Sequence, residues 1–251
     1  MLGCDCTASA DAYVLMAYFS PLAMLSKAGF LLAAASTPEV DVLCHHSLQQ
    51  RGAGPGKAHA ATWSQDPFGF VWTKDQGSWP FPDGRPRINA AAQVFARIAR
   101  TIRASSAMHP LQFQGAPEMQ FALYGTQAAA ALQGTAFQAA GGTCYVMLNR
   151  DSNGTHSVTV RAMPSATTNA SSLVVPASSA GTRCTGSGQL CWAPLPGGPV
   201  APVVATTHRD GVGARELMVE LPALSVNFVF VGAGGAHTSV GVDGSWCSAF
   251  A

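Results

Sequence analysis

Residues 145–160 read YVMLNRDSNGTHSVTV. Two runs rich in Val, Tyr and Thr flank the turn-forming residues of RDSNG, and the second run alternates apolar and polar residues as a half-buried strand does. Asn-Gly tolerates the positive φ angles that tight turns between strands require. The stretch predicts a β-hairpin, with β-structure extending on both sides of it.

The same two-residue periodicity continues through the chain beyond about residue 108, where helical patterns stop. The short β-type runs are LQFQG, QFALYG, TCYVMLNR, HSVTVRA, SLVVP, PVVATT, RELMVEL and LSVNFVFVG. Gly, Pro, Ser, Asn and Asp separate them. About eight such strands predict an antiparallel β-sandwich over residues 109–251.

Residues 1–108 have a different pattern, which predicts a helix, a strand and a second helix. Residues 11–35 are apolar on every face and read as buried helix that restarts at Pro21. Residues 40–44, VDVLC, are short, β-branched and apolar on both faces, which is typical of a strand buried in a parallel sheet. An amphipathic pattern over residues 87–103 predicts the second helix. The fold class is therefore a two-part α+β chain.

The apolar stretch from Tyr13 to Ala35 has a second interpretation, because it is about as long as a membrane span requires. No basic residue precedes it, whereas Asp5 and Asp11 do, and Pro21 and Lys27 interrupt its middle. These features favour a buried helix over a signal peptide or membrane anchor. A buried helix is therefore expected, a signal peptide or membrane anchor is the alternative, and the membrane is the less expected partner.

Composition narrows the classes of partner. The 251 residues are 48% hydrophobic, only 11% are charged, and the formal net charge is +1. A packed core is expected, and no broad field attracts nucleic acid. The seven cysteines show no spacing typical of a zinc site, so neither a metal nor another cofactor is predicted.

Three features suggest an extracellular or secretory location. Cys184 and Cys191 flank a Gly/Ser loop that a disulfide could close. Asn153 and Asn169 begin sequons for N-glycosylation, which act only in a secretory pathway. A chain rich in Ser and Thr also produces sequons by chance.

Residues 49–87 form a long connection rich in Gly, Pro and aromatic residues, and long connections inside compact domains are usually functional. Trp63, Trp72 and Trp79 lie in it, and flat rings with a polar edge suit the C–H faces of sugar rings. Asp66 could accept hydroxyl hydrogen bonds from the same ligand. The alternative is that these rings pack internally and that Asp66 forms a turn with Pro67.

The strand Cys144–Arg150, the run Leu221–Val226 and the order of elements before them resemble the C-terminal portion of retaining glycoside hydrolases of the large (β/α)8 clan, including arabinofuranosidase-like enzymes. The resemblance implies that residues 11–36 are the seventh barrel helix, 40–46 the eighth strand and 87–103 the eighth helix. It also implies carbohydrate as the partner.

On this reading, His45 and His46 stand at the C-terminal end of the eighth strand, the end of a barrel that carries the active site. Because side chains alternate across a strand, one of the two can point toward a bound sugar. The other interpretation is that both bond only to loop backbone.

The chain departs from this family at the chemistry. Retaining glycosidases need two carboxylates about 5 Å apart, and in this clan they follow the fourth and seventh strands. The four glutamates of the chain are Glu39, Glu118, Glu216 and Glu220, and none matches such a position. The expectation is a C-terminal fragment of a glycoside hydrolase, without catalytic residues and inactive alone, which the missing N-terminal part of its own barrel would complete. The alternative is a non-catalytic carbohydrate-binding or structural β-sandwich, with or without a membrane tether.

Overall fold

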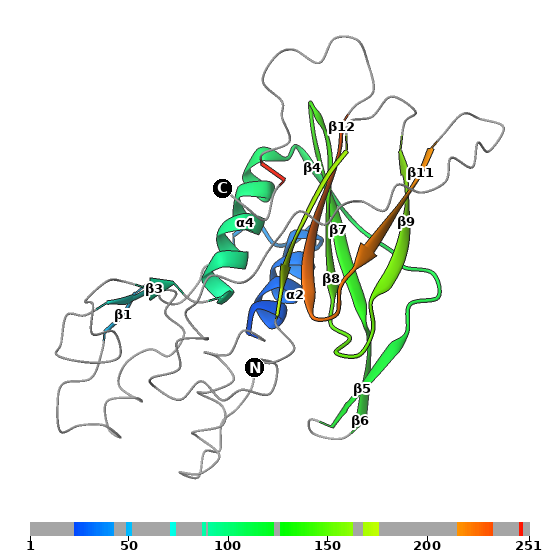
Figure 1. Cartoon of the computed structure of the whole chain (residues 1–251). Coiled ribbons are helices and arrows are strands. Elements are labelled where there is room, and N and C mark those ends of the chain that lie inside the picture. The colour runs from blue at the N-terminus through cyan, green and yellow to red at the C-terminus, as the bar shows by residue number, and fades with distance from the viewer. Residues whose placement is uncertain are drawn as a thin grey trace.

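A computed structural model describes nine stretches of the chain. They are residues 23–42, 49–51, 71–73, 87–88, 90–122, 126–162, 168–175, 215–232 and 246–247. These residues form an α+β structure of mostly antiparallel sheets and two helices (Figure 1).

The helices are α2 (Ala23–Ala35) and α4 (Ala90–Ala104). The strands are β1 (Gln49–Arg51), β2 (Val71–Thr73), β3 (Arg87–Ile88), β4 (Ala107–Pro110), β5 (Glu118–Ala122), β6 (Thr126–Ala130), β7 (Leu132–Ala139), β8 (Gly142–Asn149), β9 (His156–Ala162), β10 (Thr168–Val174), β11 (Arg215–Leu221) and β12 (Ser225–Gly232). Neither helix has the length and continuous apolar character that a membrane span requires.

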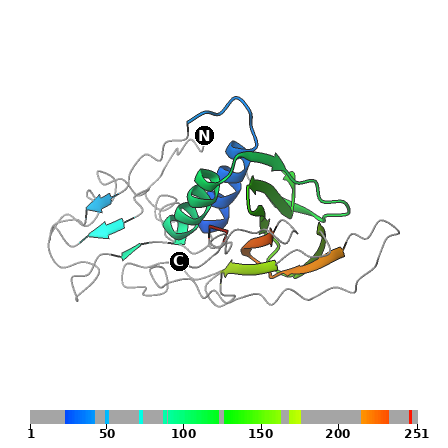
Figure 2. The same ribbon diagram turned by 90° about the horizontal axis from the view of Figure 1, so that it is seen from above.

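The central layer is a five-stranded antiparallel sheet in the order β10-β12-β8-β7-β4. Among the described strands, β9 and β11 pair with each other alone and form a second layer beside the central sheet, while both helices pack on the opposite face (Figures 1 and 2). The hairpin β5–β6 extends from one end of this arrangement. The result is a layer of helices, a central sheet and a smaller second sheet.

The helix-facing core lies between the helices and the central sheet. It contains the apolar side of α4 and several residues of α2, a helix that is apolar on most sides. Val94 and Ile98 of α4 are fully buried, and so are Met24 and Ala28 of α2. They pack against sheet residues that include Phe228, which is also fully buried. Because this core contains residues from both sides of position 108, the two regions share one packed interior; their division into domains stays a prediction.

Polar bonds fix α2 on the sheet. Thr135 of β7 is fully buried, and its hydroxyl donates to the carbonyl of Leu32 (3.3 Å) and bonds the hydroxyl of Ser36 (2.8 Å). A buried hydroxyl is expensive without a partner. Thr135 therefore determines where the end of α2 lies on β7.

The second core lies between the central sheet and β9–β11. It contains Met147 and Val229 from the central sheet, and Val160, Val219 and Leu221 from the second sheet. These residues alternate along their strands with residues that face the opposite side, as a pleated sheet requires. The predicted antiparallel sandwich is confirmed to this extent for the described residues.

The predicted hairpin at RDSNG is wrong in its pairing. The turn does join β8 to β9, but β8 pairs with β7 and β12, whereas β9 pairs with β11. Asn153 and Gly154 do not have positive φ; Gly142, the first residue of β8, does (φ 150°). The turn carries the chain from one sheet to the other and is not the end of a two-stranded hairpin.

Three other expectations are corrected. Val40 and Val42 belong to no strand and are 41% and 77% exposed, so this part of VDVLC is not buried. Residues 49–87 are not a plain loop, because β1 and β2 pair in parallel and β3 pairs with β2. The second helix begins at Ala90, after β3, and not at Arg87.

Sequence reasoning missed a disulfide. Cys144 of β8 is bonded to Cys247, 103 residues later, and both are buried in the helix-facing core. The neighbouring Trp246 packs edge-on against Phe230 and accepts a hydrogen bond from Thr101 of α4 through its carbonyl (3.1 Å). The predicted pair Cys184 and Cys191 lies outside the described residues.

Candidate functional site

The five residues His45, His46, Trp63, Asp66 and Trp79, predicted to bind substrate, lie outside the described part of the chain. Trp72 lies in β2, where its backbone is the partner of Gln50 in β1 and of Arg87 in β3. These residues stay predictions as a binding site.

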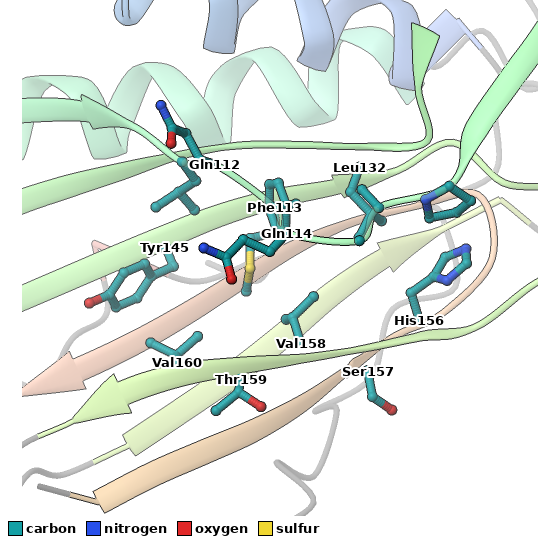
Figure 3. A pocket seen from close by; sticks show the side chains of 15 residues that line it. Gln112, Phe113, Gln114, Leu132, Tyr145, His156, Ser157, Val158, Thr159 and Val160 are labelled. Atoms are coloured by element: carbon teal, nitrogen blue, oxygen red, sulfur yellow. The ribbon is translucent and has the colours of Figure 1, made fainter.

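A cavity of about 570 Å³ opens at the side of the sandwich, and the sequence did not point to it. It lies between the segment Leu111–Pro117, strand β8 and strand β9 (Figure 3). The segment Leu111–Gly115 was predicted to be a strand and is instead irregular. The volume of the cavity falls within the range of small-molecule sites, about 300–1,000 Å³.

A glycine allows the segment to close over the sheet. Gly134 of β7 faces it, and a Cβ at that position would lie 2.9 Å from Leu111 Cδ1 and 3.2 Å from the ring of Phe113. The backbone N–H of Leu111 donates to the carbonyl of Gly134 (2.9 Å). The close approach places Phe113 and Gln114 at the edge of the cavity.

The floor of the cavity is apolar and its rim is polar. Leu132, Met147, Val158 and Val160 form much of the floor. In Figure 3 the ring of Tyr145 and the carboxamide of Gln114 lie toward one end and His156 toward the other. The hydroxyls of Ser157 and Thr159 point away on the outer side of β9, where both residues are exposed.

Tyr145 and Gln114 supply hydrogen-bonding groups at one end of the cavity. Tyr145 is half-buried, and burial raises the pKa of its phenol above the usual value. The phenol therefore stays protonated at neutral pH and can both donate and accept. Gln114 is exposed and adds a carboxamide that donates and accepts as well.

His156 is fixed by Asp151 at the other end. Its Nε2 lies 2.9 Å from Oδ2 of Asp151, and each side chain is about a quarter exposed (23% and 24%). The backbone N–H of Asn153 donates to Oδ1 of Asp151 (2.8 Å). Hydrogen bonds from Asn153 and from His156 lower the pKa of Asp151. This end of the cavity thus presents an imidazole that is positioned by the carboxylate of Asp151 behind it.

The turn behind His156 is fixed by Asn149, the Asn of the YVMLNR motif. Asn149 is fully buried, and its Nδ2 donates toward the carbonyls of Gly154 (2.9 Å), Leu221 (3.0 Å) and Pro222 (2.9 Å). Its Oδ1 accepts from the N–H of Asp151 (2.9 Å). The motif therefore has a structural role: it positions Asp151, which in turn bonds the cavity residue His156.

Both predicted sequons are accessible. Asn153 is exposed in the turn between β8 and β9, and Asn169 is exposed on β10, an edge strand of the central sheet. Within the described part of the chain, His, Cys, Asp and Glu side chains form no cluster of three or more that could hold a metal ion.

Comparisons with known proteins give similarity in structure alone. No protein-family model and no curated protein matches the chain. Three α-L-arabinofuranosidase structures are similar to part of it. A family 51 enzyme from Bifidobacterium longum shares 16% identity over 66% of this chain and 28% of its own, with a TM-score of 0.44.

The other two are an arabinose complex from Thermotoga maritima and a thermostable GH51 enzyme from Thermotoga petrophila. They share 10% and 11% identity over 66% and 65% of this chain, with TM-scores of 0.42 and 0.40. The chain spans about a third or less of each enzyme. Similarity at this level does not assign it to their family.

Proposed function

We propose that the chain is a carbohydrate-binding β-domain, and that the cavity between Leu111–Pro117, β8 and β9 holds a saccharide. The observation that carries this is the lining: an aliphatic floor below the groups of Tyr145, Gln114 and His156. Sugars present apolar C–H faces and a dense ring of hydroxyls, and sites of this size combine apolar walls with a few polar groups that fix orientation.

The described acids do not support cleavage of the sugar. Glycoside hydrolysis by the usual route needs two carboxyl groups on either side of the bond. No acidic residue lines the described cavity, and Asp151 lies behind the lining residue His156, to which it is bonded. Glu216 and Glu220 alternate with the buried Leu217 and Val219 along β11, so they face the outer side of that sheet. Binding without hydrolysis is therefore the proposal.

Titration calorimetry of the chain with a panel of neutral mono- and disaccharides tests the binding. At least one sugar should bind, and Gln114→Ala should weaken it several-fold. Gln138→Ala, an exposed glutamine on β7 that does not line the cavity, should have no effect. No binding by any sugar, or equal loss in both variants, would contradict the site.

A second candidate function is the C-terminal portion of a retaining glycosidase, inactive without the rest of its barrel. One observation favours it: α2 and α4 pack together on the central sheet, as the last two helices of a barrel beside an accessory sandwich would. Aryl glycosides should not be hydrolysed by the chain alone. Clear turnover would show that its acids suffice.

We infer an extracytoplasmic location from the Cys144–Cys247 disulfide together with the exposed sequons at Asn153 and Asn169. Disulfides persist in oxidising compartments. Mass spectrometry of protein from a secreting eukaryotic host should find the bond and a glycan at one or both asparagines; a reduced, unmodified chain would overturn this inference.

A further inference from the structure

A second cavity, of about 500 Å³, lies on the helix side of the sheet, away from the saccharide site. Apolar residues from α2, β5, β6 and the β11–β12 turn form most of its wall, and one cation is present. Its lining includes Leu25, Met119, Ala129, Ala130, Leu224 and Arg150. Ser26 adds an exposed hydroxyl at the edge.

The position of Arg150 is set by its surroundings. It directly follows β8, and its Nη2 donates to the carboxamide oxygen of Gln133, whose Nε2 donates to the carbonyl of Gly29 (3.0 Å). A Cβ at position 29 would collide with the guanidinium, so glycine allows Arg150 to lie against α2. Nη1 reaches the carbonyl of Ala130 at 3.4 Å.

Arg150 has no acidic partner within the described residues. Its side-chain hydrogen bonds to described residues go to neutral oxygens, those of Gln133 and Ala130, whereas the neighbouring Asp151 bonds His156. Burial lowers the pKa of Arg150, but a guanidinium keeps its charge at neutral pH. Within the described part of the chain, its side-chain hydrogen bonds involve Nη1 and Nη2 once each, and a guanidinium has five N–H donors, so the others suit an anion with two oxygens.

We propose that this cavity binds a small monocarboxylate with an apolar body, such as an aromatic or short aliphatic acid. The carboxylate accepts hydrogen bonds from Arg150, and the apolar body contacts Leu25, Met119 and Leu224. The half-buried guanidinium, which no acid of the described residues neutralises, gives the site its preference for an anion. The apolar walls give the preference for a ligand that is not a sugar, which separates this site from the saccharide cavity.

The test is to titrate the full chain with small acids and to measure binding by calorimetry and by NMR chemical shifts. Benzoate and hexanoate should bind. Benzamide lacks the charge and acetate lacks the apolar body, so both should bind at least tenfold more weakly than benzoate. Inorganic phosphate should resemble acetate. Equal binding of benzoate and benzamide, equal binding of benzoate and phosphate, or no binding of benzoate would overturn the proposal.

Variants place the binding at Arg150. Arg150→Met should weaken the binding of benzoate about tenfold or more, because a hydrogen bond to a charged group usually contributes that much. Arg103→Met is the matched control, because Arg103 is exposed at the end of α4. If Arg150→Met does not fold, Arg150→Lys is used instead. Lysine keeps the charge but lacks the two parallel N–H donors of the guanidinium, so this variant should bind benzoate several-fold more weakly than the wild type. Unchanged affinity in the variant that folds would overturn the proposal, whereas Gln114→Ala should leave benzoate binding intact.

Discussion

The fully buried side chain of Asn149 donates to the carbonyl of Leu221, 72 residues later in the chain, at 3.0 Å. The same amide reaches Gly154 and Pro222, so one residue joins the β8–β9 turn to the β11–β12 turn. Both turns lie where the chain changes from one sheet to the other. The sandwich is therefore held together at this end by a side chain as well as by its core.

Asn149→Ala should lower the free energy of unfolding by about 2 kcal/mol, because it removes a fully buried amide together with its hydrogen bonds to the carbonyls of Gly154, Leu221 and Pro222. Asn149→Asp should cost more, since it turns a carboxylate toward those carbonyls. Urea denaturation measures both. Asn153→Ala, at an exposed position in the same turn, is the control and should change stability by less than about 0.5 kcal/mol.

Removing the disulfide should destabilise the fold considerably. The bond between Cys144 and Cys247 closes a loop of about a hundred residues, and a crosslink of that span typically contributes about 2–5 kcal/mol. Cys247→Ser should lower the melting temperature, and a reductant should lower that of the wild type but not that of the variant. Equal melting of reduced and oxidised wild type would contradict the prediction, and non-reducing peptide mapping identifies the pair directly.

The hydrogen bonds that hold the carboxylate of Asp151 predict a loss of stability in acid. The pKa of Asp151 is lower in the folded chain than in the unfolded chain, because the N–H of Asn153 and the side chain of His156 bond its carboxylate. Its contribution is complete above about pH 4, the usual Asp value, and disappears as pH falls through the lower folded pKa. Asp151→Asn should flatten this part of the stability curve, whereas Asp41→Asn, at an exposed position, should not.

The sequence predicted individual strands better than their partners. The run Tyr145–Arg150 has strand composition, and all of it except Arg150 lies in strand β8. The partner of this strand was not predictable in the same way, because the register that pairs Ser225 with Asn149 connects segments far apart in the chain. The turn at RDSNG favoured the nearest partner, and the packing of Val158 and Val160 against the central sheet overrode it. Local patterns describe φ and ψ preferences, whereas pairing depends on which faces must be buried together.

The candidate sites were less predictable, for related reasons. Cys184 and Cys191 were predicted as a pair because they are close in sequence. The disulfide in the described residues instead joins Cys144 to Cys247, which are distant in sequence and meet in the core. The cavity between Leu111–Pro117, β8 and β9 depends on Gly134, which lets the Leu111–Pro117 segment approach β7. A glycine inside a strand pattern is the one signal that could have indicated such an approach. Val40 and Val42 have buried-strand composition and are nevertheless exposed, because composition does not supply the neighbouring strands.

Two glycines with positive φ distinguish backbone strain from steric collision. Gly142 (φ 150°) is the first residue of β8, where a Cβ would collide with the carbonyl of Val231 on the neighbouring strand. A Cβ at Gly115 (φ 72°) would meet no atom of the described residues within 4 Å beyond its chain neighbours. Gly115→Ala should therefore cost only the left-handed conformation, about 1–2 kcal/mol. Gly142→Ala should cost more, because β12 must also move. Chemical denaturation of the two variants ranks them. Equal losses would show that the sheet yields at this point and that φ alone sets the cost.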